Sequence, residues 1–273
     1  MIWVFDTTAF LHRAMHAVYG DRTPTVPETD TSFLRAATLM LAKVAESPSC
    51  THMLLAADCD GPSLRIDEYA DYKKDRKERA PVLRAQLPKF YRAMEQVGVL
   101  GWNRYEADDV IGTLVMPEDV RDVTIVSSDK DLLQFINDER RIQVYDAARL
   151  YYYDEALATK KMGVHPRQIP DLIGLIGDTS DNLPGVPGIG PTRAQKLLAE
   201  NRTLDDLYSD DGLKLAATQV GAKTYKSLVE HRDDAFLSRS LAWPRIYGGE
   251  CPKLPSLARP TDPSRLRRIA EQW

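Results

Sequence analysis

The sequence of 273 residues contains little cysteine and no long apolar run. Its three cysteines, Cys50, Cys59 and Cys251, are scattered and odd in number, which favours reduced thiols over a disulfide framework or a zinc site. No stretch approaches the roughly 18 apolar residues of a membrane helix, so no membrane partner is expected. The opening MIWVFD meets an acid at once and does not resemble a signal peptide. A cytoplasmic protein is therefore predicted.

Several common catalytic patterns are also missing. The chain has no nucleophile elbow, no Walker phosphate loop and no GxGxxG following a strand, which disfavours hydrolases of the serine type, P-loop enzymes and dinucleotide-binding domains. Histidine is scarce, with five residues. His12 and His16 have helical i, i+4 spacing but no nearby third ligand, so we interpret them as a partly exposed pair on a helix face.

Short apolar runs alternate with helical patterns through the first two-thirds of the chain. Strands are predicted at 2–5, 52–57, 99–105, 121–129 and 141–146. This alternation is typical of βαβ units in a mainly parallel sheet. Beyond about residue 154 the strand patterns fade and helices are predicted, one of them long, over 221–242. We therefore expect domains at 1–170 and 171–248, followed by residues 249–273 as a loosely packed tail or a short docking helix.

Acidic residues follow the predicted strands. Asp6, Asp58 and Asp129 each come after a strand, and in a parallel sheet those carboxyl ends share one edge. Helix capping explains any one such acid. Many carboxylates at one edge repel each other and need cations, and oxygen ligands without His or Cys favour Mg²⁺ or Mn²⁺. The candidate metal ligands are Asp6, Asp58, Glu106, Asp108, Asp109, Asp129, Asp131, Asp178 and Asp181. Two such ions would form a centre that cleaves phosphodiesters.

A basic stretch and a glycine-rich turn are candidates for binding phosphate. The stretch 65–81 carries Arg65, Lys73, Lys74, Arg76, Lys77 and Arg79, with Tyr69 and Tyr72 interleaved. It is either a solvated helix with internal ion pairs or a segment that grips a nucleic-acid backbone. The turn LPGVPGIGPTRAQKLL (183–198) leads into a helix, so it either exposes backbone N–H groups to a phosphate or serves only as a packing unit.

The net charge of −4 at first argues against a nucleic-acid partner. Setting aside the nine candidate metal ligands leaves 36 basic and 31 acidic residues, and two divalent ions would add four positive charges. The acidic total is therefore compatible with a DNA-binding surface around a metal-filled acidic site.

Taken together, the motifs resemble the 5′-nuclease family, which includes the 5′→3′ exonuclease domain of bacterial DNA polymerase I, phage 5′-exonucleases and flap endonucleases. The matching pieces are FDTTAFLHRAMHAV, LRIDEYADYKKDR, LRAQL, YEADDVIGTL, SSDKDLLQ, GDTSDNLPGVPGIGPTRAQKLL and GAKTYKSL. They occur in family order and cover residues 1 to about 248. The polymerase I exonuclease domain is the most similar, here as a stand-alone bacterial or phage enzyme.

The resemblance implies an α/β fold: a Rossmann-like, PIN-related domain with a helical arch at about 67–85, followed by a helix–three-turn–helix module. It implies a monomer that cleaves DNA at 5′ flaps, nicks and 5′ ends in replication or repair, using two Mg²⁺ ions that Mn²⁺ can replace. Some relatives also hold K⁺ at the hairpin. Alternatives are a PIN-type RNA nuclease and a catalytically silent DNA-junction binder.

Residue roles follow from the matched motifs. Lys73, Arg76 and Arg65 match family basic residues expected at the scissile phosphate or the 5′ strand. Asp6, Asp58, Glu106 and Asp108 match the ligands of a first metal, and Asp129, Asp131, Asp178 and Asp181 those of a second. Asp109 matches a family acid of less direct role. The expected DNA contacts are Lys73, Lys74, Arg76, Gly185, Gly188, Ile189, Gly190, Thr192, Arg193 and Lys196.

Overall fold

The computed structural model describes residues 1–76, 78–95, 97–147, 149–249 and 253–273, so Lys77 and Cys251 lie outside the described residues. Within that part of the chain the strands form a seven-stranded sheet with the order β3-β2-β1-β4-β5-β6, and β7 also pairs with β2. The strands are β1 (Ile2–Asp6), β2 (His52–Ala56), β3 (Val99–Leu100), β4 (Val123–Val126), β5 (Ile142–Asp146), β6 (Tyr151–Tyr153) and β7 (Arg259–Pro260).

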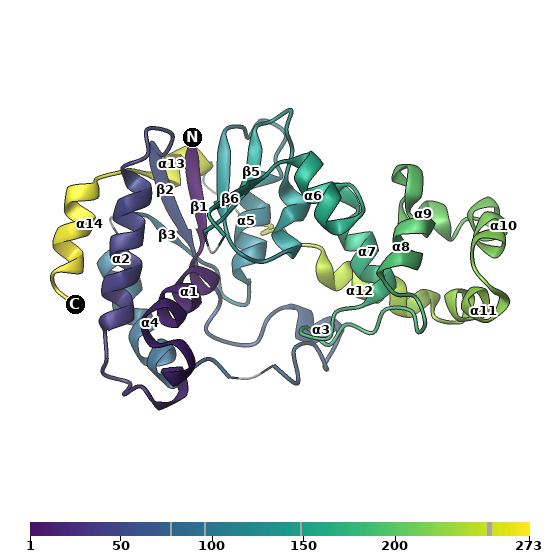
Figure 1. Cartoon of the computed structure of the whole chain (residues 1–273), viewed down its shortest axis with the longest axis horizontal. Coiled ribbons are helices and arrows are strands. Elements are labelled where there is room, and N and C mark those ends of the chain that lie inside the picture. Colours follow the sequence, from purple (N-terminus) through teal and green to yellow (C-terminus); the bar gives the residue numbers. More distant parts are fainter. Residues whose placement is uncertain (77, 96, 148, 250–252) are drawn as a thin grey trace.

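The sheet is mainly parallel, as predicted. Strands β1 to β5 pair in parallel, while β6 and β7 run antiparallel to β5 and β2. The predicted third strand is present but short, and β6 was not predicted. All five parallel strands therefore end at one edge of the sheet, at the bottom of the view in Figure 1.

Side chains alternate between the two faces of the central strands. Trp3 and Phe5 of β1 join the core beneath α1 (Thr7–Tyr19), α2 (Ser32–Ala45) and α4 (Pro81–Met94). Val4 joins the opposite core, with α5 (Ala107–Val115). Because successive strand residues point to opposite faces, an apolar run such as IWVF is buried from both sides.

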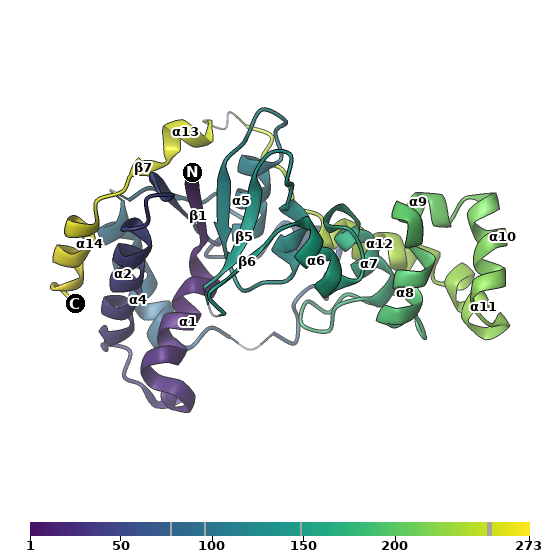
Figure 2. The same cartoon turned by 45° about the horizontal axis from the view of Figure 1, so that its top comes forward.

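The second half of the chain is helical and extends away from the sheet (Figure 2). Its helices are α6 (Glu155–Met162), α7 (Ile169–Ile176), α8 (Pro191–Leu197), α9 (Leu204–Leu207), α10 (Asp210–Gln219), α11 (Ala222–Glu230) and α12 (Arg232–Ala242). Short 3-10 helices occur at Gly20–Thr25, Asp131–Phe135, Pro166–Gln168 and Ala199–Asn201. One hydrophobic core runs from Ile125 of the sheet through Leu175 to Leu197, so the helical part is anchored to the sheet.

Two helix predictions need correction. The helix predicted over 221–242 is two helices that meet at His231, which adopts non-helical backbone angles. The helical arch predicted at 67–85 contains only the short α3 (Arg65–Glu68) and the first turn of α4, and the described residues between them form turns and coil. Lys73 has a left-handed φ of 55°, and cations three residues apart disfavour a helix here. The described residues of this segment, 69–76 and 78–80, cross the carboxyl-end edge of the sheet (Figures 1 and 2) and are called the segment 69–80 below.

The C-terminal residues pack against the first domain. They form α13 (Leu254–Leu257), β7 and α14 (Pro263–Ala270), and α14 buries Leu266 against the core beneath α2. Trp273 Nε1 donates a hydrogen bond to Thr38 Oγ1 at 3.1 Å. Of the two predictions for this stretch, the docking helix is right and the loose tail is wrong. No helix in the described ranges is both long and apolar enough to span a bilayer.

Candidate active site

A cavity of about 180 Å³ opens at the edge where the parallel strands end. Its walls come from the end of β1 and the start of α1, from the residues after β2, β3 and β4, from the segment 69–80 and from the loop after α7. They carry eight of the nine predicted metal ligands: Asp6, Asp58, Glu106, Asp108, Asp129, Asp131, Asp178 and Asp181. Lys73 and Arg76 also line the cavity. The fold therefore brings together carboxylates that are up to 175 positions apart in the sequence.

Two acids on the sheet side also hold the local backbone. Asp6 ends β1 and caps α1, accepting a hydrogen bond from the Ala9 N–H at 3.1 Å and another from Ser127 Oγ at 2.9 Å. Asp58 follows β2 and accepts one from the Ala107 N–H at 2.8 Å, at the start of α5. Capping and a place in the cavity are thus compatible, because each carboxylate oxygen has a second lone pair beyond the one that accepts its hydrogen bond.

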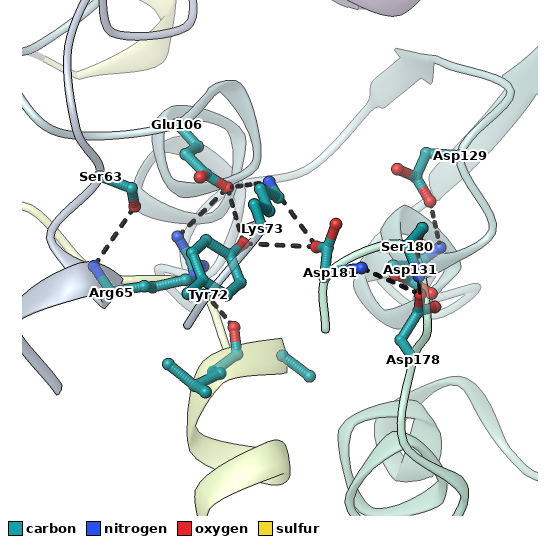
Figure 3. Close-up of polar contacts among 12 residues, drawn as sticks. Ser63, Arg65, Tyr72, Lys73, Glu106, Asp129, Asp131, Asp178, Ser180 and Asp181 are labelled. Atoms are coloured by element: carbon teal, nitrogen blue, oxygen red, sulfur yellow. Dashed lines mark hydrogen bonds and ion pairs between the residues drawn. The ribbon is translucent and has the colours of Figure 1, made fainter. Parts of the chain in front are cut away.

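A second group of acids surrounds the loop after α7. Asp129 accepts a hydrogen bond from the Asp131 N–H at 2.9 Å, and Asp178 accepts one from the Ser180 N–H at 2.8 Å. Lys130 Nζ lies 3.0 Å from Asp178. Figure 3 shows this group on the far side of Asp181 from Glu106. Asp129, Asp131 and Asp178 therefore form a group at this loop, next to the acids at the sheet, and the charge of Asp129 also acts on Asp6 and Asp108 of the sheet group.

Lys73 lies between the two groups (Figure 3). Its Nζ is 2.7 Å from Glu106 and 3.6 Å from Asp181, and its backbone N–H donates to the Asp181 carbonyl at 3.0 Å. Tyr72 donates its hydroxyl to Glu106 at 3.1 Å. Burial works against the charge of Lys73, but Glu106, Tyr72 and Asp181 outweigh it and raise the pKa of the ammonium. Lys73 is therefore a permanent cation in the acidic cavity.

The crowded acids resist ionisation. Burial, with the charge of Asp58, raises the pKa of Asp6 to about 7. Burial and Asp129 raise the pKa of Asp131 to about 7 and that of Asp108 well above its usual range. Glu106 differs: burial opposes its charge, but Lys73 and Arg65 overcome it and lower its pKa. The cavity thus has more carboxylates than its own cations neutralise.

The donor set fits a hard divalent cation. Every ligand candidate in the cavity is a carboxylate, and Asp131 Oδ1 is buried without a hydrogen-bond partner among the described residues. As the side chains stand, no three of the acidic, histidine or cysteine side chains described here converge closely enough to hold an ion. Binding would therefore draw the carboxylates inward, relieving their repulsion.

Asp109 and Arg65 do not reach the cavity. Asp109 is fully buried, and its two oxygens accept both terminal nitrogens of Arg65 at 2.7 and 2.9 Å. It also accepts the backbone N–H groups of Glu106 and Arg245, at 2.8 and 2.7 Å. Both oxygens of Asp109 and both terminal nitrogens of Arg65 are engaged in these hydrogen bonds, so neither residue is available to a metal or a phosphate. We therefore revise both predictions: this buried pair joins α3, just before the segment 69–80, to α5, and Arg65 Nε also donates to the Leu241 carbonyl of α12 at 2.7 Å.

The glycine turn lies outside the acidic cavity. Gly185 has φ +58°, and a Cβ there would stand 2.3 Å from the Gly177 backbone nitrogen, so a side chain does not fit. Gly188, with φ +84°, has open space around it, and Gly190 begins α8. Ile189 is buried in the core, and its backbone N–H donates to the Val186 carbonyl at 3.0 Å.

The polar residues of α8 face solvent. Thr192, Arg193 and Lys196 are exposed. Arg193 donates to the Gly188 carbonyl at 2.7 Å, and Lys196 donates to the Gln219 carbonyl at 3.0 Å. Lys74 is also exposed and pairs with Asp71 at 2.9 Å, away from the cavity lining.

Sequence reasoning missed four polar cavity residues: Thr8, His12, Lys130 and Ser180. The i, i+4 spacing of the histidines predicts only that His12 is part of an exposed helix pair. Thr8 and His12 stand four apart on α1, just after Asp6, so helical spacing from that acid could have identified them. Burial and the nearby Arg79 and Arg76 lower the pKa of His12, which keeps the imidazole neutral in this cationic part of the site.

Comparison with known proteins places this geometry in a family. The model described as "5'-3' exonuclease, N-terminal resolvase-like domain" matches residues 1–163, and "5'-3' exonuclease, C-terminal SAM fold" matches residues 164–245. DNA polymerase I of Streptococcus pneumoniae serotype 4 is 33% identical over 248 residues, 88% of this chain but 28% of that protein. The chain therefore spans little more than a quarter of the polymerases it matches.

Three other similarities cover most of this chain and most of the matched protein. Flap endonuclease Xni of Shewanella denitrificans is 32% identical over 235 residues, 85% of this chain and 88% of that protein. A structure of the phage T5 5′-exonuclease with bound zinc ions has a TM-score of 0.68 at 18% identity, covering 88% of each chain. The flap endonuclease from Methanococcus jannaschii gives 0.54 at 13% identity, covering 99% of this chain and 90% of its own. These structures share the fold.

The buried ion pair generates a first prediction. Asp109→Asn should lower the free energy of unfolding by about 3–5 kcal/mol, because it leaves the Arg65 guanidinium charged and buried without its partner. Urea denaturation with EDTA present measures this. Asp108→Asn is the matched control and should leave stability unchanged or raised, since it removes one of the repelling charges. Equal stability of the two variants would contradict the structural role of Asp109.

The raised pKa of Asp131 generates a second prediction. Folding raises this pKa from its usual 3.8 to about 7, so between these pH values the folded state holds a proton that the unfolded state has lost. The free energy of unfolding therefore falls as the pH rises from about 4 through 7. In EDTA, Asp131→Asn should gain stability over the wild type with rising pH, on the order of 1–2 kcal/mol by pH 8. Thermal unfolding across this range measures it, with the exposed Glu118→Gln as control. Parallel curves for the wild type and Asp131→Asn would contradict it.

Proposed function

This chain belongs to the 5′-3′ exonuclease family, and on that premise we propose that it is a structure-specific 5′ nuclease. It hydrolyses phosphodiester bonds at 5′ flaps and 5′ ends of duplex DNA by two-metal catalysis. The observation that carries the proposal is the acidic cavity: eight carboxylates and Lys73 converge where the parallel strands end. Such a site suits cations and a phosphate. Among the described residues that line it, Ser180 is the only serine or cysteine.

We assign the acids to two Mg²⁺ ions, with Mn²⁺ as a substitute. Asp6, Asp58, Glu106 and Asp108 would hold one ion, and Asp129, Asp131, Asp178 and Asp181 the other. When bound, the ions would lower the pKa of the attacking water and neutralise charge on the leaving 3′ oxygen. The two groups of carboxylates described above support this division.

Lys73 and Arg76 are the proposed phosphate ligands. Lys73 Nζ is already at the centre of the cavity, where its charge would offset the charge that develops on the transferred phosphate. Arg76 is exposed and lines the same cavity, so its guanidinium is free to reach the 5′ strand. Lys74, exposed on the same segment, would add charge outside the cavity. Arg65 contributes indirectly, by holding the start of the segment.

The glycine turn is the proposed duplex contact. Gly188 and Gly190, which are exposed, would present backbone groups to a DNA phosphate, with Thr192, Arg193 and Lys196 beside them. Gly185 and Ile189 would contribute by shaping the turn, because both are buried and their N–H groups donate to Ser238 Oγ and to the Val186 carbonyl. We extend to this turn the proposal of a K⁺ site built from backbone carbonyls. Residues 1–170 would then cut, and residues 171–248 would set the position of the duplex. A monomer suffices for both, since one chain carries both surfaces.

A cleavage assay tests the enzyme proposal. With Mg²⁺, the protein should release 5′-phosphorylated products from a 5′-flap duplex, and EDTA should abolish this. Asp129→Ala should lower the rate at least about a hundredfold, because it removes a metal ligand, while DNA affinity by fluorescence anisotropy changes little. Binding without cleavage would identify a silent junction binder, and preference for single-stranded RNA would identify an RNA nuclease.

A second experiment tests the glycine turn. Gly188→Leu should weaken binding of duplex DNA about tenfold, because a bulky side chain keeps the backbone from a phosphate. The left-handed φ of this position also disfavours leucine, which would change the conformation of the turn. Gly248→Leu is the control, since Gly248 also has open space around it but lies outside the turn. Anisotropy with a blunt duplex measures the affinity, and circular dichroism checks the fold. Unchanged affinity would remove this turn from the DNA interface.

A further inference from the structure

Arg79 forms an ion pair with Asp58, one of the proposed metal ligands. Its terminal nitrogen lies 3.1 Å from Asp58 Oδ2, while Asp58 Oδ1 accepts the Ala107 N–H at 2.8 Å. Both oxygens of Asp58 therefore have a donor. This differs from Asp131, whose Oδ1 has no hydrogen-bond partner among the described residues. An ion that binds Asp58 through Oδ2 must first displace the guanidinium.

The side chain of Arg79 is positioned to leave. It belongs to the end of segment 69–80, just before α4, and is 33% exposed, with Asp58 at 19%. An ion pair with this access to solvent holds weakly, because water screens the attraction. No other carboxylate in the described part of the chain forms an ion pair with Arg79. Movement of the guanidinium therefore breaks one modest interaction.

Space for the displaced side chain lies beside it. A second cavity of about 450 Å³ adjoins the acidic one and shares Thr8, His12, Asp58, Lys73, Arg76 and Glu106 with it. Cys59, Gly61, Glu78 and Arg79 complete its lining. Arg76 and Arg79 both line this cavity, so two guanidinium groups border the same space. Such a group of donors suits a phosphate oxygen.

We propose that Arg79 is an exchangeable counter-ion of Asp58, which competes with a divalent cation and is released to bind a phosphate of the DNA strand when the cation takes its place. The inference rests on the proposed function, since it needs both a metal at Asp58 and a strand in the adjoining cavity. Arginine suits the exchange because its planar guanidinium pairs equally well with carboxylate and with phosphate. The metal would then strengthen DNA binding indirectly, through the released Arg79, in addition to its own contacts with the DNA.

The first half of the test uses no DNA. Isothermal titration with Mn²⁺ should show that Arg79→Gln binds the ion about two- to fivefold more tightly than the wild type, the range expected from a partly exposed ion pair. Arg76→Gln removes the same charge from the same cavity without breaking an ion pair to a described carboxylate, so its affinity should change less. Equal gains in the two variants would show a general field effect and overturn the exchange.

The second half measures cleavage of a 5′-flap duplex. In Arg79→Gln the Mg²⁺ concentration for half-maximal rate should fall, while KM for DNA at saturating Mg²⁺ rises about two- to fivefold. Arg84→Gln, an exposed arginine of α4, is the control for both quantities. An unchanged KM would show that Arg79 does not bind the DNA. If no variant cleaves, including the wild type, the proposed function fails, whereas the Mn²⁺ result still decides whether Arg79 competes for Asp58.

Discussion

Repulsion among carboxylates is the constraint on which the site depends. Eight acids line one small cavity, and the raised pKa values of Asp6, Asp108 and Asp131 show that the fold alone does not neutralise them. A site of this kind costs stability unless cations offset its charge. The structure meets part of that cost with its own cations: Lys73 pairs with Glu106, Lys130 with Asp178 and Arg79 with Asp58. Bound metal would supply the remainder.

These three cations come from elements that differ in their attachment to the fold. Lys130 directly precedes the 3-10 helix after β4, whereas Lys73 and Arg79 belong to the irregular segment 69–80. That segment is held at its base by the buried Arg65–Asp109 pair and further along by the Lys73–Asp181 backbone hydrogen bond. Its far end is held by the partly exposed ion pair between Arg79 and Asp58. The same segment therefore has a rigid start, which positions Lys73, and an end that can exchange partners.

Sequence patterns predicted most of the fold and most of the site. Buried strands such as IWVF and HMLLA have unbroken apolar character, and the acids that follow them correctly indicate the edge of the sheet at which the acidic cavity lies. Predictions were poorer where charge or hydrogen bonding overrides local preference. The helical arch is mostly coil, because Lys73 is tied to Asp181 in a left-handed conformation. Asp109 resembles its neighbours in sequence, and only the packed structure reveals Arg65 as its partner.

By itself, the sequence determined the order of strands and helices, the set of acids and the glycine turn, because those depend on local periodicity and on residues with narrow conformational preferences. Only the tertiary structure decided which acids share a cavity, which one is buried in an ion pair, and which cation faces each carboxylate. Those outcomes depend on contacts between residues far apart in the chain, such as Lys73 with Glu106 and Arg65 with Asp109. Local patterns cannot specify them, since an aspartate near a helix start has the same local preference whether it caps, pairs or binds metal.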